Sequence, residues 1–187
     1  KITITSDFLR AEAMLNKDNS IKTQMETRVG SGLDIHQFEP GNSVKLGGIE
    51  ISHDHSLKGH SDADAALHVL TDALLGALAE GDIGTHFPPS EKKWQGEPSD
   101  TFLRFAADRV AKRGGRIVHL DLTIICEKPK IAPHTQKMRQ NIAHICSIEE
   151  GRISIKATTS ESMGFIGRGE GLMTMANATI EVPRGED

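Results

Sequence analysis

The sequence lacks the cysteines that a disulfide framework requires. Its 187 residues contain only two, Cys126 and Cys146, and these do not form a CxxC pair. A disulfide-stabilised fold is therefore excluded, and a reducing compartment such as the cytoplasm fits the composition best. Cys126 lies in the apolar run LDLTIIC and Cys146 near the end of a predicted helix, so we expect both thiols to be buried and unreactive.

Long apolar runs and an excess of basic residues are also missing. No stretch approaches the roughly 20 apolar residues of a membrane span, and the first residues do not follow a signal-peptide pattern. The net charge of −4 argues against a broad basic surface for nucleic acid. We expect a soluble protein that binds neither membrane nor nucleic acid, which leaves room for a local pocket for a phosphorylated small molecule.

Two parts of unequal size are predicted along the chain. Residues 1–24 read as a tail or linker, in which SDFLRAEAML is expected to form a helix N-capped by Ser6, followed by the polar stretch NKDNSIKTQ. Residues 25–187 are expected to form the main domain.

Apolar periodicity and turn residues predict alternating strands and helices in the main domain. The predicted strands are 27–37, 44–52, 116–126, 152–158 and 172–182, the predicted helices are 61–80, 99–113 and 133–146, and 84–98 is a predicted loop. This order predicts an α/β fold, an α+β sandwich in which one mixed sheet is covered by helices.

Asp34-Ile35-His36 is the first motif with potential for chemistry. In a strand, residues two apart point to the same face, so Asp34 and His36 project together while Leu33 and Ile35 face the other way. A carboxylate beside an imidazole provides two of the three protein ligands of a catalytic zinc site. Two solvated residues at a strand end would give the same pattern, so the motif does not decide alone.

The segment HSDADAALHVLTD supplies the third candidate ligand. Asp64, His68 and Asp72 recur every four residues and lie along one stripe of the predicted helix, opposite its leucines. A solvated polar face would also explain the stripe, but residues 61–79 contain no Lys, Arg or Glu. We therefore choose His68 as the third metal ligand and expect the two aspartates to orient it.

The start of this helix is a candidate anion site. Ser61 is its predicted N-cap, with Asp64 three residues on and Gly81 just past the end of the helix. Free backbone N–H groups and the helix dipole favour an anion near His60 and Ser61. A plain capping role for Ser61 explains the pair almost equally well.

A second hydroxyl-rich segment follows the strand at 152–158. Thr158, Thr159 and Ser160 leave this strand and are expected to open a short helix at Glu161, where hydroxyls and N–H groups could cradle phosphate oxygens. The following GFIGRGEG is neither a Walker A loop nor a dinucleotide fingerprint.

Other charged and histidine side chains have simpler interpretations. Arg168, between two glycines, could clamp an anion or pair with Glu170. We expect His53-Asp54-His55 to be a loop feature and assign His119, His134 and His144 to structure or surface.

Taken together, these segments resemble the 2-C-methyl-D-erythritol 2,4-cyclodiphosphate synthase family. The matching stretches are RVGSGLDIH (28–36), GHSDADAALHVLTDALLGALAEGDIGTHFP (59–88), DLTIICEKPKIAPH (121–134) and IKATTSESMGFIGRGEG (155–171). They occur in family order and cover nearly all of 25–182, which makes the resemblance far more specific than any one short motif.

The resemblance implies a reaction and an assembly. The family converts 4-diphosphocytidyl-2-C-methyl-D-erythritol 2-phosphate into the cyclic 2,4-diphosphate with release of CMP, in non-mevalonate isoprenoid biosynthesis. Its members are homotrimers with each site between two subunits. The tail KITITSDFLRAEAML also resembles the end of a cytidylyltransferase domain that some bacteria fuse to this cyclase, which implies the cyclase half of a bifunctional enzyme.

The resemblance also implies roles for individual residues. Asp34, His36 and His68 would bind Zn²⁺ or another divalent cation. Glu161 would hold Mg²⁺ or Mn²⁺ bridging the substrate diphosphate, and His60 and Thr159 would stabilise the transition state. The implied substrate-binding residues, which share positions with the family's, are Asp34, His36, His60, Ser61, Asp82, Gly84, Lys130, Thr158, Thr159, Ser160, Glu161, Phe165 and Arg168, and 126–132 matches the loop that receives the cytidine.

Two other functions stay open at this point. One is a zinc-dependent phosphoesterase, in which water at the metal's open position attacks a phosphate. The other is a non-catalytic trimeric protein that binds a metal or a nucleotide.

Overall fold

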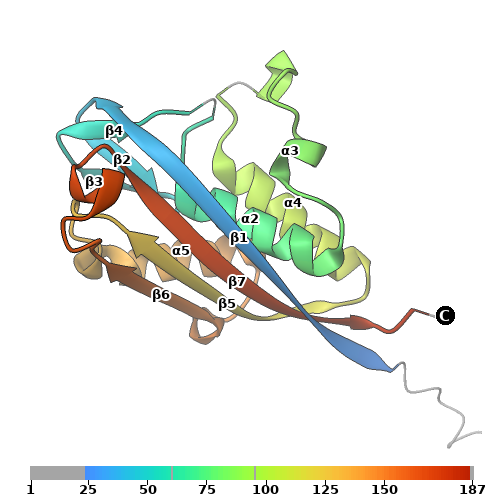
Figure 1. Cartoon of the computed structure of the whole chain (residues 1–187). Coiled ribbons are helices and arrows are strands. Elements are labelled where there is room, and N and C mark those ends of the chain that lie inside the picture. The colour runs from blue at the N-terminus through green and yellow to red at the C-terminus, as the bar shows by residue number, and fades with distance from the viewer. Residues whose placement is uncertain (1–23, 60, 95, 186–187) are drawn as a thin grey trace, which may run out of the picture.

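Five strands form one mixed sheet, in the order β4-β1-β7-β5-β6, in the computed structural model, which describes residues 24–59, 61–94 and 96–185. β1 (Met25–Pro40) pairs antiparallel with β7 (Gly171–Pro183) and with β4 (His55–Leu57). β5 (Arg116–Ile125) pairs antiparallel with β7 and parallel with β6 (Ile153–Thr158). The long central strands β1 and β7 run side by side (Figure 1).

Three helices cover one face of this sheet (Figure 1). α2 (Ala65–Leu78) packs on β1 and β7, α4 (Ser99–Lys112) packs on α2, and α5 (Thr135–Cys146) packs on β6 and α4. The predicted mixed α/β arrangement is therefore confirmed. None of the described helices has the length and apolar character that crossing a bilayer demands.

Short elements fill the connections. They are the two-stranded sheet of β2 (Ser43–Leu46) and β3 (Ile49–Ser52), the short helices α3 (Ile83–His86) and α6 (Gly164–Gly167), and the 3-10 helices η1 (Lys92–Trp94), η2 (Ala132–His134) and η3 (Glu150–Arg152). The single strand predicted at 44–52 was wrong, because Gly47 and Gly48 have positive φ and turn the chain into a hairpin. β4 was not predicted, and the predicted loop at 84–98 contains η1 and most of α3.

The boundaries of α2 differ from the predicted 61–80. Asp64 is the N-cap, because its side chain accepts the backbone N–H of Leu67, so the predicted Ser61 cap was wrong. The helix ends at Leu78, where Ala79 takes a left-handed conformation and the N–H of Glu80 reaches back to the carbonyl of Leu75. Most of α2 is buried, since it lies between the sheet and α4.

Helix α2 approaches β1 closely through two glycines. A Cβ atom on Gly30 would overlap the carbonyl oxygen of Ala73 and the backbone nitrogen of Ala77. A Cβ atom on Gly32 would overlap the carbonyl oxygen of Val69. The backbones of strand and helix are thus in direct contact, which fixes the position of α2 over the strand that carries Asp34 and His36.

The other face of the sheet exposes apolar side chains. Val29, Leu33 and Ile35 of β1 and Met175 of β7 are 44% to 65% exposed. Leu33 and Met175 are cross-strand partners, and the exposed apolar side chains form a strip along β1 that Ser31 interrupts between Val29 and Leu33. At the end of the sheet where β1 begins, the backbone N–H of Arg184 donates to the carbonyl of Gln24 over 2.7 Å, so the chain enters and leaves the sheet at neighbouring points.

The glycine contact leads to a stability test. Because the added methyl group would meet helix backbone rather than a mobile side chain, we expect Gly30→Ala to lower the free energy of unfolding by about 1–3 kcal/mol. Thermal unfolding at one fixed protein concentration measures the effect. Gly151→Ala is the control, since no atom lies within 4 Å of a Cβ there. Equal stability of the two variants would contradict the proposed role of the backbone contact.

Candidate active site

Strand β1 and helix α2 bring the three predicted metal ligands together. One ligand atom from each of Asp34, His36 and His68 lies within 4.8 Å of the other two. Oδ2 of Asp34 is 3.0 Å from Nε2 of His36 and 3.3 Å from Nδ1 of His68. These side chains are only 12% to 24% exposed, so the group is sheltered yet reachable from solvent. The predicted juxtaposition is confirmed.

The electrostatics of this group suit a cation. Burial alone would raise the pKa of Asp34, but its hydrogen bond with His36 contributes to holding that pKa well below its ordinary value. Nδ1 of His36 is 2.9 Å from the carbonyl oxygen of Lys58, which directs Nε2 toward Asp34. One carboxylate oxygen and two imidazole nitrogens are a donor set that zinc takes at catalytic sites, so the residues fit such an ion.

The groups within hydrogen-bond distance of Nε2 of His68 are hydroxyls rather than the predicted carboxylates. Nε2 of His68 lies 2.8 Å from Oγ of Ser99 and 3.1 Å from Oγ of Ser61. The prediction that Asp64 and Asp72 orient this imidazole was wrong, because both are committed to backbone N–H groups elsewhere.

The two aspartates fix neighbouring segments to α2. The fully buried Asp64 accepts the N–H groups of Gly47, Gly48 and Leu67, which ties the β2–β3 turn to the start of α2. Asp72 accepts the N–H of Ile83 over 2.8 Å. Burial raises the pKa of both carboxyls.

Near the starts of α2 and α3 lie three further predicted substrate residues, Ser61, Asp82 and Gly84. Ser61 faces His68, whereas His60 lies outside the described residues. Asp82 caps α3 by accepting the backbone N–H of Thr85 over 2.8 Å, and Gly84 lies within that helix. Asp82 and Gly84 therefore belong to a tight turn beyond the far end of α2.

The hydroxyl-rich segment after β6 forms a turn before a short helix. Oγ1 of Thr159 donates to Glu161 over 2.6 Å, and Oγ1 of Thr158 contacts the carbonyl of Thr159 over 3.3 Å. Glu161 and Ser162 have positive φ, at 53° and 63°. The predicted helix start at Glu161 was wrong, because this left-handed turn delays α6 until Gly164.

Glu127 organises this turn and was missed by the sequence reasoning. One of its carboxylate oxygens accepts the backbone N–H and hydroxyl of Ser160, at 3.1 and 2.9 Å, and the N–H of Ser162 at 3.2 Å. Hydrogen bonding to Ser160 lowers the pKa of Glu127, so the carboxylate is ionised at neutral pH. A usable signal existed, since Glu127 closely follows β5 and the parallel strand β6 ends beside it.

The remaining predicted substrate residues flank this turn. Phe165 lies in α6, and Arg168 follows it. Arg168 pairs with Glu170, Nε to Oε1, over 2.7 Å, which is one of the two predicted alternatives. Lys130 lies in the loop between β5 and η2, beside the turn that Glu127 holds.

Within one chain, the metal-ligand group lies far from the hydroxyl-rich turn that follows β6. The register aligns Ile35 with Met173, Met173 with Ile125, and Ile125 with Thr158. Three strand spacings of about 4.8 Å separate the two places by on the order of 14 Å. The structure therefore brings the metal-ligand residues together but does not bring Thr158, Thr159 or Glu161 to them.

A second group of potential ligands, His53, Asp54 and His55, has a local explanation. Its ligand atoms lie within 4.8 Å of one another, but Nδ1 of His53 accepts the backbone N–H of His55 over 2.9 Å. The His53 ring also stacks on Phe38, with 5.0 Å between the ring centroids. These contacts build a turn at His53 and Asp54, as predicted, whereas His55 is already the first residue of β4.

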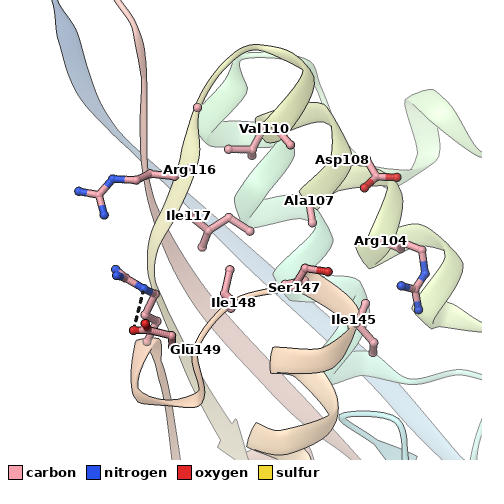
Figure 2. A pocket seen from close by; sticks show the side chains of 14 residues that line it. Arg104, Ala107, Asp108, Val110, Arg116, Ile117, Ile145, Ser147, Ile148 and Glu149 are labelled. Atoms are coloured by element: carbon pink, nitrogen blue, oxygen red, sulfur yellow. Dashed lines mark ion pairs between the residues drawn. The ribbon is translucent and has the colours of Figure 1, made fainter.

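A cavity of about 440 Å³ lies at the other end of β5. Figure 2 shows apolar side chains such as Val110, Ile117 and Ile145 within it and charged side chains such as Arg104 and Arg116 at its edge. Ile124 and Asp34 both pair with Thr174 of β7, so they lie at the same level of the sheet. Ile117 precedes Ile124 by seven residues on β5, so about 23 Å of strand separates this cavity from the metal-ligand group.

The two thiols do not offer a nucleophile. Cys126 and Cys146 are both buried, and burial raises their pKa values to about 11 and about 12. Since only the thiolate attacks an electrophile, both cysteines are inert at neutral pH, as predicted from the sequence.

Thiol titration tests this assignment. At pH 8 a thiol of pKa about 11 is ionised to about 0.1%, against roughly a quarter for an ordinary cysteine. We expect neither cysteine of the native protein to react with a disulfide reagent within minutes, and both to react after unfolding in guanidinium. A native thiol that reacted at the rate of a free cysteine would contradict the burial described here.

Comparisons with known proteins match nearly the whole chain. A family model described as the YgbB family matches residues 27–181. The bifunctional enzyme IspD/IspF of Caulobacter vibrioides is 52% identical over 183 residues, which are 98% of this chain and 46% of that enzyme. This chain therefore spans about half the length of the curated relatives that it matches.

Two solved structures share the fold at substantial identity. The complex of IspF from Plasmodium falciparum with CDP has a TM-score of 0.75 and 33% identity, covering 85% of this chain and 97% of that one. A structure of 2C-methyl-D-erythritol-2,4-cyclodiphosphate synthase has a TM-score of 0.75 and 35% identity, covering 82% and 99%.

Proposed function

This chain belongs to the YgbB family, and we propose that it is a cyclodiphosphate synthase of isoprenoid biosynthesis. The proposed reaction converts 4-diphosphocytidyl-2-C-methyl-D-erythritol 2-phosphate into 2-C-methyl-D-erythritol 2,4-cyclodiphosphate and CMP. The observation that carries the proposal is the convergence of Asp34, His36 and His68 in a chain with this family match. The similarity to a solved synthase of this name supports it.

The proposed reaction does not require a nucleophile from the protein. An oxygen of the substrate's own 2-phosphate attacks the β-phosphorus, a new P–O bond closes the ring, and the bond to the CMP oxygen breaks. The attacking phosphate is already ionised at neutral pH, so neither the buried thiols nor a strong base is needed. The reaction is an intramolecular phosphoryl transfer with elimination of CMP, which makes the enzyme a phosphorus–oxygen lyase.

Repulsion between the two phosphates is the main obstacle. At about 4 Å and an effective dielectric constant of about 20, each pair of unit charges repels by about 4 kcal/mol. Hydroxyl and N–H donors from Thr158, Thr159 and Ser160, with His60 and Ser61 near the start of α2, would offset this charge and hold the attacking oxygen in line. Thr159 and His60 are the proposed transition-state stabilisers.

Cations complete the proposed charge balance. Asp34, His36 and His68 would hold zinc or another divalent ion, and Glu161 would hold Mg²⁺ or Mn²⁺. Bound there, such ions neutralise phosphate charge and polarise the reacting phosphorus. Asp82 and Gly84 would contact the substrate beyond α2, and Lys130, Phe165 and Arg168 would contact it from the neighbouring loops, with 126–132 receiving the cytidine.

We further propose that three copies assemble with each active site between two of them. The strip of exposed Val29, Leu33, Ile35 and Met175 supports an interface on the open face of the sheet. The separation of about 14 Å between the metal-ligand group and Thr158 supports completion of the site by a second subunit. The assembly would work in the cytoplasm.

Residues 1–24 would belong to a fused cytidylyltransferase domain, and 25–187 to the cyclase. The C. vibrioides bifunctional enzyme aligns with 98% of this chain, so the alignment extends well into the first 24 residues, which supports this division. Residues 1–23 lie outside the described part of the chain.

Turnover is the direct test of the reaction. We expect the protein, incubated with the cytidine diphosphate substrate and Mg²⁺, to give the cyclic diphosphate and CMP, which phosphorus NMR distinguishes from inorganic phosphate. His68→Ala should lower the rate at least about 100-fold, because a ligand to the catalytic cation is lost. The circular dichroism spectrum should stay unchanged.

His144→Ala is the matched control, since this histidine is an exposed residue of α5. It should keep full activity. Release of inorganic phosphate in place of the cyclic product would favour the phosphoesterase. Metal or nucleotide binding without any turnover would favour the non-catalytic protein.

The assembly has its own test. We expect sedimentation equilibrium to give three times the 20.3 kDa mass of the chain. Val29→Glu should shift the protein toward the monomer, because it places a charge in the apolar strip. Gln140→Glu adds the same charge on the exposed side of α5 and should leave the mass unchanged. A trimeric Val29→Glu protein would show that this strip is not the interface.

A further inference from the structure

We propose that Ser99 and Asp62 are positioning residues that keep a proton on Nε2 of His68 and so present its Nδ1 to the cation. This inference rests on the proposed metal-dependent function. Neither side chain belongs to the group of Asp34, His36 and His68, and their task would be to prepare one of its three ligands.

The contacts form a chain that leads away from the metal-ligand group. Oγ of Ser99 lies 2.8 Å from Nε2 of His68, and Ser99 is fully buried. The hydroxyl of Ser99 donates to Oδ1 of Asp62, and so does its backbone N–H, over 3.2 Å. The other oxygen of Asp62 is 2.6 Å from Nζ of Lys45. Three separate segments, β2, the loop before α2, and the start of α4, thus meet behind His68.

Proton bookkeeping along this chain gives the tautomer. A carboxylate only accepts, and a serine hydroxyl has a single proton to donate. Because that proton is directed to Asp62, Oγ of Ser99 can only accept from His68. The hydrogen on the imidazole must then sit on Nε2, which leaves the lone pair of Nδ1 for the side that faces Asp34.

Two further observations concern the charge of the Asp62 carboxylate and the availability of the Ser99 hydroxyl. Burial would raise the pKa of Asp62, but the hydrogen bonds from Lys45 and Ser99 outweigh it and the pKa lies below its ordinary value. Ser99 also has no capping duty, since α4 has no side-chain cap hydrogen bond at its start. Its hydroxyl is therefore available to His68, and its loss should not unravel the helix.

Ser61 offers a comparison within the same site. Its Oγ is also near Nε2 of His68, at 3.1 Å, but its second contact is the backbone N–H of Ala63 at 3.3 Å. A carboxylate that would fix the direction of the hydroxyl proton is thus linked to Ser99 and not to Ser61 by the described contacts. Ser61→Ala is accordingly the matched control for Ser99→Ala.

The experiment measures zinc affinity and the histidine tautomer rather than turnover. Competition with a chromophoric chelator should give a 10- to 100-fold weaker affinity for Zn²⁺ in Ser99→Ala, the range seen when a group behind a metal ligand is removed. Long-range ¹⁵N–¹H spectra of the imidazoles at alkaline pH, with His68 assigned by its absence in His68→Ala, should show the Nε2–H form in the wild type. They should show a mixture of tautomers in Ser99→Ala.

Ser61→Ala should keep the Nε2–H form, and Ser99→Thr, which keeps a hydroxyl, should restore both affinity and tautomer. Should the extra methyl of threonine prevent folding, Asp62→Asn serves instead and should also yield mixed tautomers, since an amide can donate to Ser99. Unchanged affinity and tautomer in Ser99→Ala would overturn the inference. A wild type with the Nε2–H form and tight zinc binding but no cyclase turnover would refute the proposed function and leave the positioning role standing.

Discussion

The candidate site depends on the direct backbone contact between helix α2 and strand β1. At Gly30 and Gly32 no side chain separates the two elements, and the carbonyl oxygens of Ala73 and Val69 occupy the space that a Cβ atom would need. This brings His68 within reach of two side chains on the strand. A metal centre divided between a strand and a helix requires placement to about 0.5 Å, and packing through mobile side chains would not supply it. The apolar core beneath α2 then holds that distance constant.

Much of this arrangement could be predicted from the sequence because it follows from local periodicity. The two-residue repeat of a strand places Asp34 beside His36, and the helical repeat places His68 on a face that avoids long charged side chains. The start of α2 was harder to predict from the sequence, because Ser61 and Asp64 are both good helix caps. Only the contact of Asp64 with the Gly47–Gly48 turn decides between them. Periodicity gave no signal for Ser99, and for Glu127 the position just after β5 could suggest a role but not its partners. Each acts on a partner more than 30 residues away, and such contacts exist only after the chain has folded.

Residues of the candidate site are held in position by polar groups that do not belong to the site. Lys58 fixes the ring of His36 through a backbone carbonyl, and Glu127 holds the turn of Thr158 and Ser160 through one carboxylate oxygen. The left-handed residues Glu161 and Ser162 cost free energy in isolation, by about 1–3 kcal/mol each. Hydrogen bonds from Ser160 and Ser162 to Glu127 hold this turn in the folded protein, so the turn keeps its shape before any ligand arrives and less ordering is needed on binding.

The hydrogen bond between Gln24 and Arg184 has a consequence for modular evolution. Entry and exit of the polypeptide lie together, about 30 Å along β1 from Asp34. A neighbouring module can therefore be gained or shed at either point without disturbing the end that carries Asp34 and His36, and a circular permutation joining the two points would need only a short bridge. Architectures of one or two modules are thus equally compatible with this fold.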